Sequence, residues 1–325
     1  MKGQALANLA MRLGLALDLG SNEKFDPQLD RAKKLFDAAE PAGFESIWLG
    51  ESFHDKPEPF HLPAPLITLA HLGAFTKLRL GTGVLLLRAY NVRKLAYEAA
   101  LVDQLTGGRL TLGVGLGDRG ISTRLGEGRL APDFFDDGLS ILREAWREPG
   151  GPAGPADGRH LAPLPLQRGG PKILVGGQGT RAVRRAAAHG DGYFAATSYS
   201  DDLLRIRARE YRDRCEDGGG EVCVNRLCVV RESRSEARRV ANSYLGPVTT
   251  FYAKLGVWGL GPDGTADDAA GVVLAGSPRD VASRLAEYED WGVTGVHLRL
   301  APVGMPAADA IETIELIGDE LRSRA

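Results

Sequence analysis

The chain has 325 residues, of which 43% are hydrophobic and 25% are charged, so it can build a full-sized core without disulfides or metals. Its 40 lysines and arginines against 42 aspartates and glutamates give a net charge of −2, without the basic excess typical of nucleic-acid-binding proteins. No run approaches the roughly 20 apolar residues that span a bilayer, and three cysteines fit neither a disulfide framework nor a zinc site. We therefore expect a soluble, cytoplasmic protein that binds neither nucleic acid nor membrane.

Short apolar runs alternate with helical patterns along the chain. The predicted strands are, in chain order, 12–17, 46–49, 78–87, 109–115, 172–175, 192–196, 222–231 and 295–300. The predicted helices are 27–42, 66–75, 92–105, 132–146, 180–189, 201–216, 235–255, 278–291 and 307–322. Such alternation is typical of the α/β class with a parallel sheet, and eight strand–helix units fit one (β/α)₈ or TIM barrel with an extra helical segment before the eighth strand.

We interpret the chain as one barrel domain, 1–325, that begins with an N-terminal arm at 1–10. Three insertion segments interrupt the repeat, at 117–131, 149–171 and 244–276. The alternative is a pair of doubly wound domains, for which the Gly- and Pro-rich segment 149–171 is the only candidate linker.

In such barrels the active site is built where the strands end, and two endings carry chemistry. After the second strand, Glu51, Ser52 and His54 offer a carboxylate, a hydroxyl and an imidazole, although a solvated, helix-capping loop is an equally good interpretation. After the fifth strand, Gly176-Gly177-Gln178-Gly179-Thr180 opens directly into a helix. Free backbone N–H groups at a helix N-terminus favour a phosphate.

Other kinds of site find no support in the sequence. The six histidines form no HxxxH pattern, no CxxC pair is present and no GxSxG elbow marks a serine hydrolase, so we expect no metal. An aldolase-type barrel would need a lysine at a strand end, but Lys172 begins its strand. A phosphate cradle without a metal or nucleophile indicates that a cofactor supplies the reactivity.

Four segments together resemble the luciferase-like family of flavin and deazaflavin oxidoreductases. They are FESIWLGES (44–52), LRLGTGVLLL (78–87), the stretch 91–117 ending in LTGGRLTLGVGLG, and PKILVGGQGTRAVRRAAAHGDGY (171–193). The resemblance implies a TIM barrel that binds reduced FMN or coenzyme F420, with a non-proline cis peptide at or beside Gly83-Val84. It implies cofactor contacts at Asp18, Gly83, Val84, Gly115, Gly117, Gly176, Gly177, Gln178, Gly179 and Thr180.

The chain departs from the family at one position. Many members carry an acidic residue followed by histidine after the second strand, whereas here Ser52 follows Glu51, and His54 lies two residues further on. We predict that Glu51, Ser52 and His54 form the catalytic edge of the site. We also predict a lid over the substrate that includes Asp118, Arg119, Tyr252 and Trp258.

The function most compatible with these features is an FMN-dependent monooxygenase acting on a small organic substrate, supplied with reduced flavin by a separate flavin reductase. The alternatives are hydride transfer with F420 and a flavin-binding protein without catalysis. The resemblance further implies a homodimer formed through the faces of 66–75 and 95–105.

Overall fold

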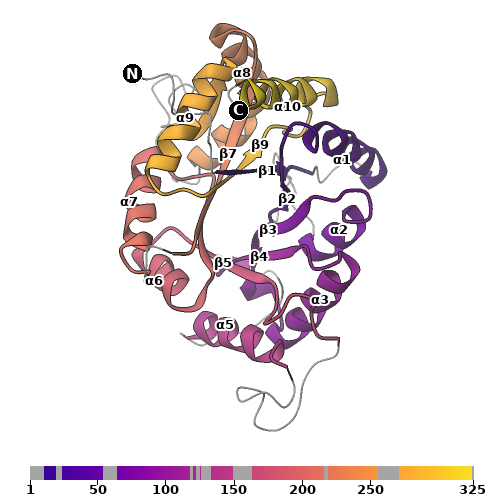
Figure 1. Ribbon diagram of the computed structural model, residues 1–325, viewed down its shortest axis with the longest axis vertical. Helices are drawn as coiled ribbons and strands as arrows, with labels where there is room; N and C mark the ends of the chain where they lie inside the picture. Colours follow the sequence, from indigo (N-terminus) through magenta and orange to yellow (C-terminus); the bar gives the residue numbers. More distant parts are fainter. Residues whose placement is uncertain are drawn as a thin grey trace.

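The computed structural model describes residues 11–19, 24–53, 64–117, 120–121, 125, 133–148, 163–215, 219–254 and 271–323. Eight parallel strands close into a barrel in the order β1-β2-β3-β4-β5-β6-β7-β9, with β9 paired to β1 (Figure 1). Their bounds are β1 Arg12–Leu17, β2 Ser46–Leu49, β3 Arg79–Leu86, β4 Leu110–Gly115, β5 Lys172–Gly176, β6 Gly192–Ala195, β7 Glu221–Val230 and β9 Gly295–Arg299. The predicted TIM barrel is confirmed. Because β4 pairs with β5, no sheet boundary falls at segment 149–171.

A ninth strand, β8 (Val273–Gly276), pairs with β7 outside the ring. The strand β7 is long enough for both roles, since its first residues pair with β6 and residues Leu227–Val230 pair with β8. The strand β8 is not among the strands predicted from the sequence. Its four residues, VLAG, follow a segment expected to be irregular and are too few to show a hydrophobic periodicity.

Helices cover the outside of the barrel (Figure 1). They are α1 Phe25–Ala39, α2 Pro65–Leu72, α3 Val92–Leu105, α5 Phe134–Ala145, α6 Thr180–His189, α7 Asp201–Arg212, α8 Arg234–Lys254, α9 Pro278–Asp290 and α10 Ala307–Arg322. Local signals start several of them; for example, Asn91 caps α3 and a reciprocal Ser277–Asp280 capping box opens α9. Among the described residues, no helix combines the length and apolar character that crossing a bilayer requires.

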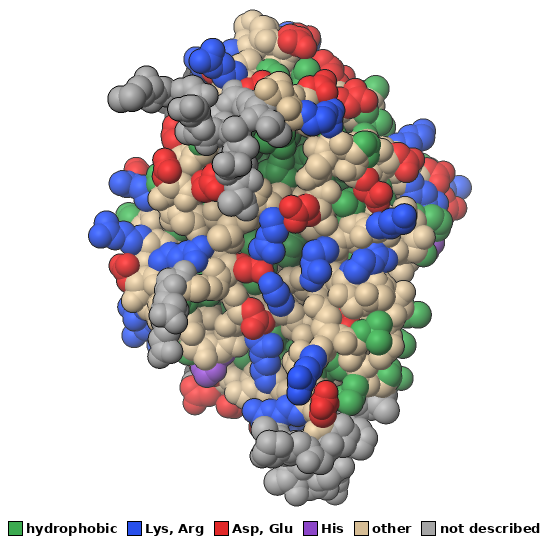
Figure 2. Space-filling view, in the orientation of Figure 1, with side chains coloured by type: hydrophobic (Ala, Val, Ile, Leu, Met, Phe, Trp, Pro, Cys, Tyr) green, Lys and Arg blue, Asp and Glu red, His purple; other side chains and the backbone are tan. Residues whose placement is uncertain are grey.

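The predicted helices and strands agree with these bounds to within a few residues. The largest difference is at the predicted helix 201–216, because α7 already ends at Arg212, where Asp213 is its C-cap. On the face of the molecule shown in Figure 2, basic and acidic side chains are mixed across the centre, as the near-zero net charge leads one to expect.

Trp48 fills the middle of the barrel. Its ring stacks on His297 with centroids 3.8 Å apart and lies 5.6 Å from the ring of Phe194. Space for it depends on Gly81, where a Cβ atom would lie 2.2 Å from the indole. Trp48 lines two cavities, one of about 450 Å³ at the C-terminal ends of the strands and one of about 360 Å³ at their N-terminal ends. It therefore forms part of the floor of the C-terminal mouth.

Candidate active site

The larger mouth of the barrel holds a cavity of about 450 Å³, within the range of small-molecule and cofactor sites. Every barrel strand contributes to it, either directly or through the loop that follows. Its lining residues are Ala16, Leu17, Asp18, Trp48, Gly50, Glu51, Ser52, Phe53, Gly83, Val84, Leu86, Gly117, Gly176, Gly177, Gln178, Phe194, Ala196, Thr197, Asn225, Phe251, Tyr252 and Arg299. The wall is mainly apolar, with a few polar groups at defined places.

Glu51 is the acidic group of the cavity with a strongly shifted pKa. It follows β2 and is buried, and its two oxygens accept hydrogen bonds from the Leu86 N–H at 2.8 Å and from the Tyr90 hydroxyl at 2.5 Å. Burial raises the pKa of Glu51 to about 7, although both hydrogen bonds oppose the shift. Near neutral pH this carboxyl group can therefore either give or take a proton.

Ser52 adds a polar atom to the same rim. Its Oγ is buried and finds no hydrogen-bond partner within the part of the chain that the structure describes. His54, the third residue of the predicted catalytic edge, lies outside the described residues.

Asp18 and Arg299 form a buried ion pair on another wall. Two guanidinium nitrogens of Arg299 lie 2.7 to 3.3 Å from the Asp18 oxygens, and a third nitrogen donates to Thr197 Oγ1 and to the Tyr252 hydroxyl. Burial lowers the pKa of Arg299, but the charges and hydrogen bonds of Asp18 and Tyr252 together outweigh this effect, and the pKa lies above its ordinary value. Arg299 is therefore charged, and its hydrogen bond to the Tyr252 hydroxyl fixes that side chain at the cavity wall.

The loop from Gly176 to Thr180 has the geometry of a phosphate cradle. The Gly177 carbonyl accepts hydrogen bonds from the Tyr193 and Tyr199 hydroxyls, so it is held away from the helix end. The N–H groups of Gln178 and Gly179 have no backbone partner among the described residues and precede the first turn of α6. Free N–H groups at a helix N-terminus can donate hydrogen bonds to an anion such as a phosphate.

Gly177 is essential to the shape of this loop. Its φ of +148° is one that side-chain-bearing residues rarely adopt, and a Cβ atom there would lie 2.7 Å from Ala182 Cβ. Gly179, by contrast, has a φ of −86° and open space around it. Arg207 of α7 supports the loop from outside, with bonds to the Gln178 carbonyl and Thr180 Oγ1.

The Gly83-Val84 peptide is cis, as expected from the resemblance, and both residues line the cavity. Gly115 does not line it but leaves room for Val84, since a Cβ atom there would lie 2.8 Å from Val84 Cγ2. Gly117 lines the cavity with a φ of +83°.

The structure brings most of the predicted site residues together. Those on the cavity wall are Asp18, Glu51, Ser52, Gly83, Val84, Gly117, Gly176, Gly177, Gln178 and Tyr252, whereas Gly115, Gly179 and Thr180 lie beside it. Asp118, Arg119 and Trp258 of the predicted lid lie outside the described residues. Lys172 forms an ion pair with Glu221 at the N-terminal end of β5, away from the cavity. Within the described residues no cluster of His, Cys, Asp and Glu could hold a metal ion.

Sequence reasoning missed several residues of the site, among them Tyr90, Thr197, Asn225 and Arg299. A usable signal existed for two of them, because Asn225 and Arg299 are polar residues within largely apolar strand segments, VCVNRLCVV and GVHLRL. A polar residue inside a buried strand needs a partner, which in a barrel is found either in its interior or under its helices. Tyr90 carried no such signal, since it follows β3 as an ordinary loop residue.

The chain is similar to known proteins in both sequence and structure. The sequence matches the family described as luciferase-like monooxygenases over residues 11–295. The uncharacterized protein y4vJ of Sinorhizobium fredii is 31% identical over 227 residues, which are 64% of this chain and 61% of that protein. The oxygenase component of the flavin-dependent trigonelline monooxygenase of Acinetobacter baylyi is 26% identical over 256 residues, covering 73% of this chain and 68% of that protein.

Solved structures share the fold at low sequence identity. The monooxygenase RslO1 from Streptomyces bottropensis superposes with a TM-score of 0.80 at 21% identity, over 96% of this chain and 99% of the other. The oxygenating constituent of 3,6-diketocamphane monooxygenase from Pseudomonas putida, in complex with FMN, gives 0.73 at 20% identity, over 97% and 98%. The coenzyme F420-dependent tetrahydromethanopterin reductase of Methanopyrus kandleri gives 0.72 at 16% identity, over 96% and 99%.

Proposed function

The chain belongs to the luciferase-like monooxygenase family, and we propose that it is an oxidoreductase that uses reduced FMN and dioxygen to oxygenate a small organic substrate. The observation that carries the proposal is the cavity itself, which combines a phosphate cradle, a mainly apolar wall and a carboxyl group with a pKa near 7. The trigonelline and 3,6-diketocamphane monooxygenases support the choice of reaction.

The described residues fit a flavin mononucleotide. Gly176 to Thr180 would hold its phosphate, and the rest of the cavity, with Val84, Trp48 and Phe194 on its wall, offers apolar surface for a planar ring. When bound, the reduced flavin would supply the electrons that activate dioxygen, one atom of which would enter the substrate and the other leave as water. The protein's own contribution is to bind, orient and exclude water.

Glu51 would move the protons that this reaction requires. With a pKa near 7 it is present in both forms at neutral pH, and Tyr90 and the Leu86 N–H hold its oxygens in fixed positions. Ser52, next to it, would donate a hydrogen bond where many relatives carry histidine. The Asp18–Arg299 pair would leave the far wall close to neutral and so favour an uncharged or weakly polar substrate.

Hydride transfer with F420 is the second candidate. The glycine cradle recognises a phosphate and would serve that cofactor as well, and the reductase from Methanopyrus kandleri has the same fold. The two functions differ in oxygen: a deazaflavin has carbon at position 5 and transfers hydride without readily reacting with dioxygen.

The test is incorporation of labelled oxygen. Purified protein would be incubated under ¹⁸O₂ with FMN, a separate flavin reductase and NADH, and with a panel of small ketones and N-heterocyclic acids that includes trigonelline. We expect one ¹⁸O atom in the product of at least one substrate and none when F420 and its reductant replace FMN. Substrate conversion with reduced F420 in the absence of oxygen would favour hydride transfer, and no conversion with either cofactor would favour a binding protein.

A further inference from the structure

Asn225 is an amide buried in the floor of the cavity. It lies in the middle of β7, is 7% exposed and lines the cavity wall. Its neighbours Cys223 and Leu227, two residues away on either side, are apolar and buried. A polar side chain at such a place is costly unless its hydrogen bonds are made.

One half of the amide has a partner. The Nδ2 group donates to the Gly83 carbonyl at 3.2 Å, across the barrel on β3. This contact fixes which end of the amide is which, because the Gly83 oxygen can only accept and must therefore face nitrogen. The Oδ1 atom consequently lies at the other position, where it is buried and has no hydrogen-bond partner within the described residues.

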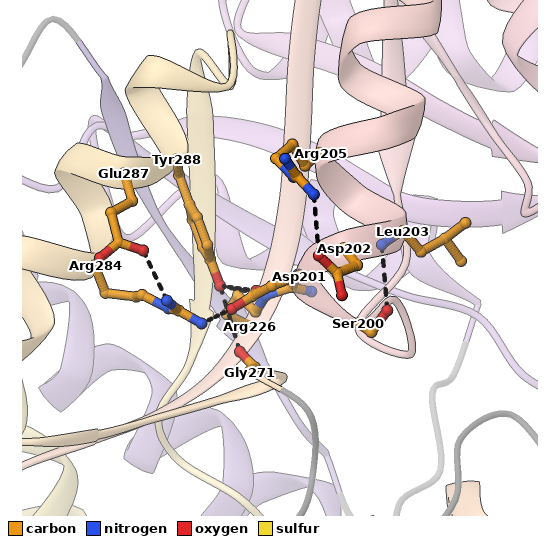
Figure 3. A network of polar contacts seen from close by, with 10 residues as sticks. All are labelled: Ser200, Asp201, Asp202, Leu203, Arg205, Arg226, Gly271, Arg284, Glu287 and Tyr288. Atoms are coloured by element: carbon orange, nitrogen blue, oxygen red, sulfur yellow. Dashed lines mark hydrogen bonds and ion pairs between the residues drawn. The ribbon is translucent and has the colours of Figure 1, made fainter.

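Arg226, the next residue along β7, belongs to a network of polar contacts that links it to α7 and α9 (Figure 3). Arg226, whose side chain is completely buried, donates to the Asn225 carbonyl at 3.2 Å and to the Tyr288 hydroxyl at 2.9 Å, and pairs with Asp201. Tyr288 and Arg284 of α9 both bind Asp201 at the start of α7. The network ties β7 to two helices and holds the backbone at Asn225, while the hydrogen bond to Gly83 orients the amide.

A fixed, unpaired acceptor in a cofactor-sized cavity calls for a donor on the ligand. A buried carbonyl without a hydrogen bond destabilises the protein, and a ligand N–H would offset this cost. The isoalloxazine ring of FMN carries an N–H at position 3 in both redox states, and its anionic reduced form, with N1 deprotonated, gains one at position 5. A deazaflavin has only the first of these, because its position 5 is carbon.

We infer that Asn225 is a cofactor-binding residue, whose Oδ1 accepts a hydrogen bond from a ring N–H of the bound flavin. This inference rests on the proposed function. Such a contact, made from the barrel floor, would fix the orientation of the ring relative to Glu51.

The test compares variants by anaerobic binding titration with oxidised and reduced FMN. Asn225→Leu removes the acceptor at nearly constant size, and Cys228→Ala, on the same strand but in the core away from the cavity, is the matched control. We expect Asn225→Leu to weaken binding about tenfold and Cys228→Ala to change it less than twofold. A loss for reduced FMN alone would assign the contact to position 5, and an equal loss in both states to position 3; either result supports the inference.

Ligand analogues keep the test valid if Asn225→Leu folds poorly. 3-Methyl-FMN and reduced 5-deaza-FMN each lack one of the two ring N–H groups, so at least one of them should bind the wild-type protein about tenfold more weakly than FMN. The inference is overturned if both analogues bind like FMN, or if Asn225→Leu retains wild-type affinity. A wild-type protein that binds no flavin would overturn the proposed function as well, so the two failures are distinguishable.

Discussion

Burial raises the pKa of the Glu51 carboxyl group well above that of an ordinary glutamate. The same two hydrogen bonds in water would lower its pKa, and only the loss of solvent explains a value near 7. The sequence identified the residue from its position after the second strand, but it could not give this value, because the burial of Glu51 depends on how segments distant in the sequence, such as those of Leu86 and Tyr90, pack around it.

We expect Glu51→Gln to lower turnover by about 10² to 10⁴-fold while cofactor affinity stays nearly unchanged, because the loss of a general acid or base affects the chemical step. The pH–rate profile should also lose its limb near pH 7. A fall in wild-type rate above that pH would assign the acid role, and a fall below it the base role. We expect His54→Ala to be less damaging; equal activity of Glu51→Gln and wild type would show that protons come from elsewhere.

The same shift predicts how stability depends on pH. In the folded protein Glu51 keeps its proton up to a pKa of about 7, above the ordinary value of 4.5. The contribution of this bound proton to the free energy of unfolding is therefore complete below pH 4.5 and is lost as pH rises through 7. Glu51→Gln should therefore become more stable relative to wild type between pH 5 and pH 8, by an amount on the order of 3 kcal/mol. Urea unfolding at the two pH values measures it, and a constant difference would contradict the assignment.

Gly177 and Gly179 offer a matched pair within the phosphate cradle. Gly177→Ala should weaken FMN binding at least tenfold, because its φ and the 2.7 Å approach to Ala182 force the loop to move. Gly179→Ala, with a common φ and open space, should change affinity less than threefold. Fluorescence titration with FMN distinguishes them, and equal losses would mean that the loop shape does not determine phosphate binding.

Among the helices, α2 and α3 are distinguished by the apolar character of their outward faces. Among the described residues, large exposed hydrophobic side chains gather on these helices and the turn after α2; they are Ile67, Phe75, Tyr97, Leu101 and Leu105. On α3 the three residues repeat at every fourth position and form one stripe. Exposed apolar patches of this kind mark interaction sites, which agrees with the proposed homodimer.

We therefore expect Leu101→Glu combined with Leu105→Glu to convert a dimer into a monomer in multi-angle light scattering at micromolar concentration, because two buried charges would be unpaired at the interface. Ile206→Glu, an equally exposed apolar site on α7, is the control and should leave the mass unchanged. A wild-type monomer would contradict the proposal.

The sequence predicted the bounds of most helices and strands well, but it did not predict the contacts between them. Long periodic stretches such as α3 and the continuous apolar run of β3 were placed to within a residue or two, since both patterns come from burial. The strand β8 was not found, because four residues carry too little pattern. Contacts across the barrel, such as that from Asn225 to Gly83, depend on closure and cannot be seen in a local pattern.

In the whole molecule, the ion pair of Asp18 and Arg299 lies where the sheet closes into a barrel. It connects the segment after β1 with β9, the first and last strands of the ring, inside the cavity wall. A buried pair is weak evidence of net stabilisation, but removal of one partner leaves an unpaired buried charge. Loss of the pair is therefore expected to disturb both the cavity wall and the packing of β1 against β9.

Asp18→Asn should destabilise the protein by roughly 3 to 5 kcal/mol, because Arg299 stays charged in the core. Asp202→Asn, which breaks an exposed ion pair with Arg205, should change the free energy of unfolding by less than about 1 kcal/mol. Urea unfolding compares the two variants, and similar small effects would show that Arg299 gains other partners when Asp18 loses its charge.

We propose that the C-terminal mouth of the barrel binds a reduced flavin. An anaerobic equilibrium titration of the purified protein with reduced FMN, repeated with F420, tests it most directly. We predict saturable, one-to-one binding of reduced FMN with a micromolar or lower Kd, at least tenfold tighter than F420 and weakened by Gly177→Ala. Preference for F420 would contradict the oxygenase assignment, and failure to bind either cofactor would contradict the account of the site.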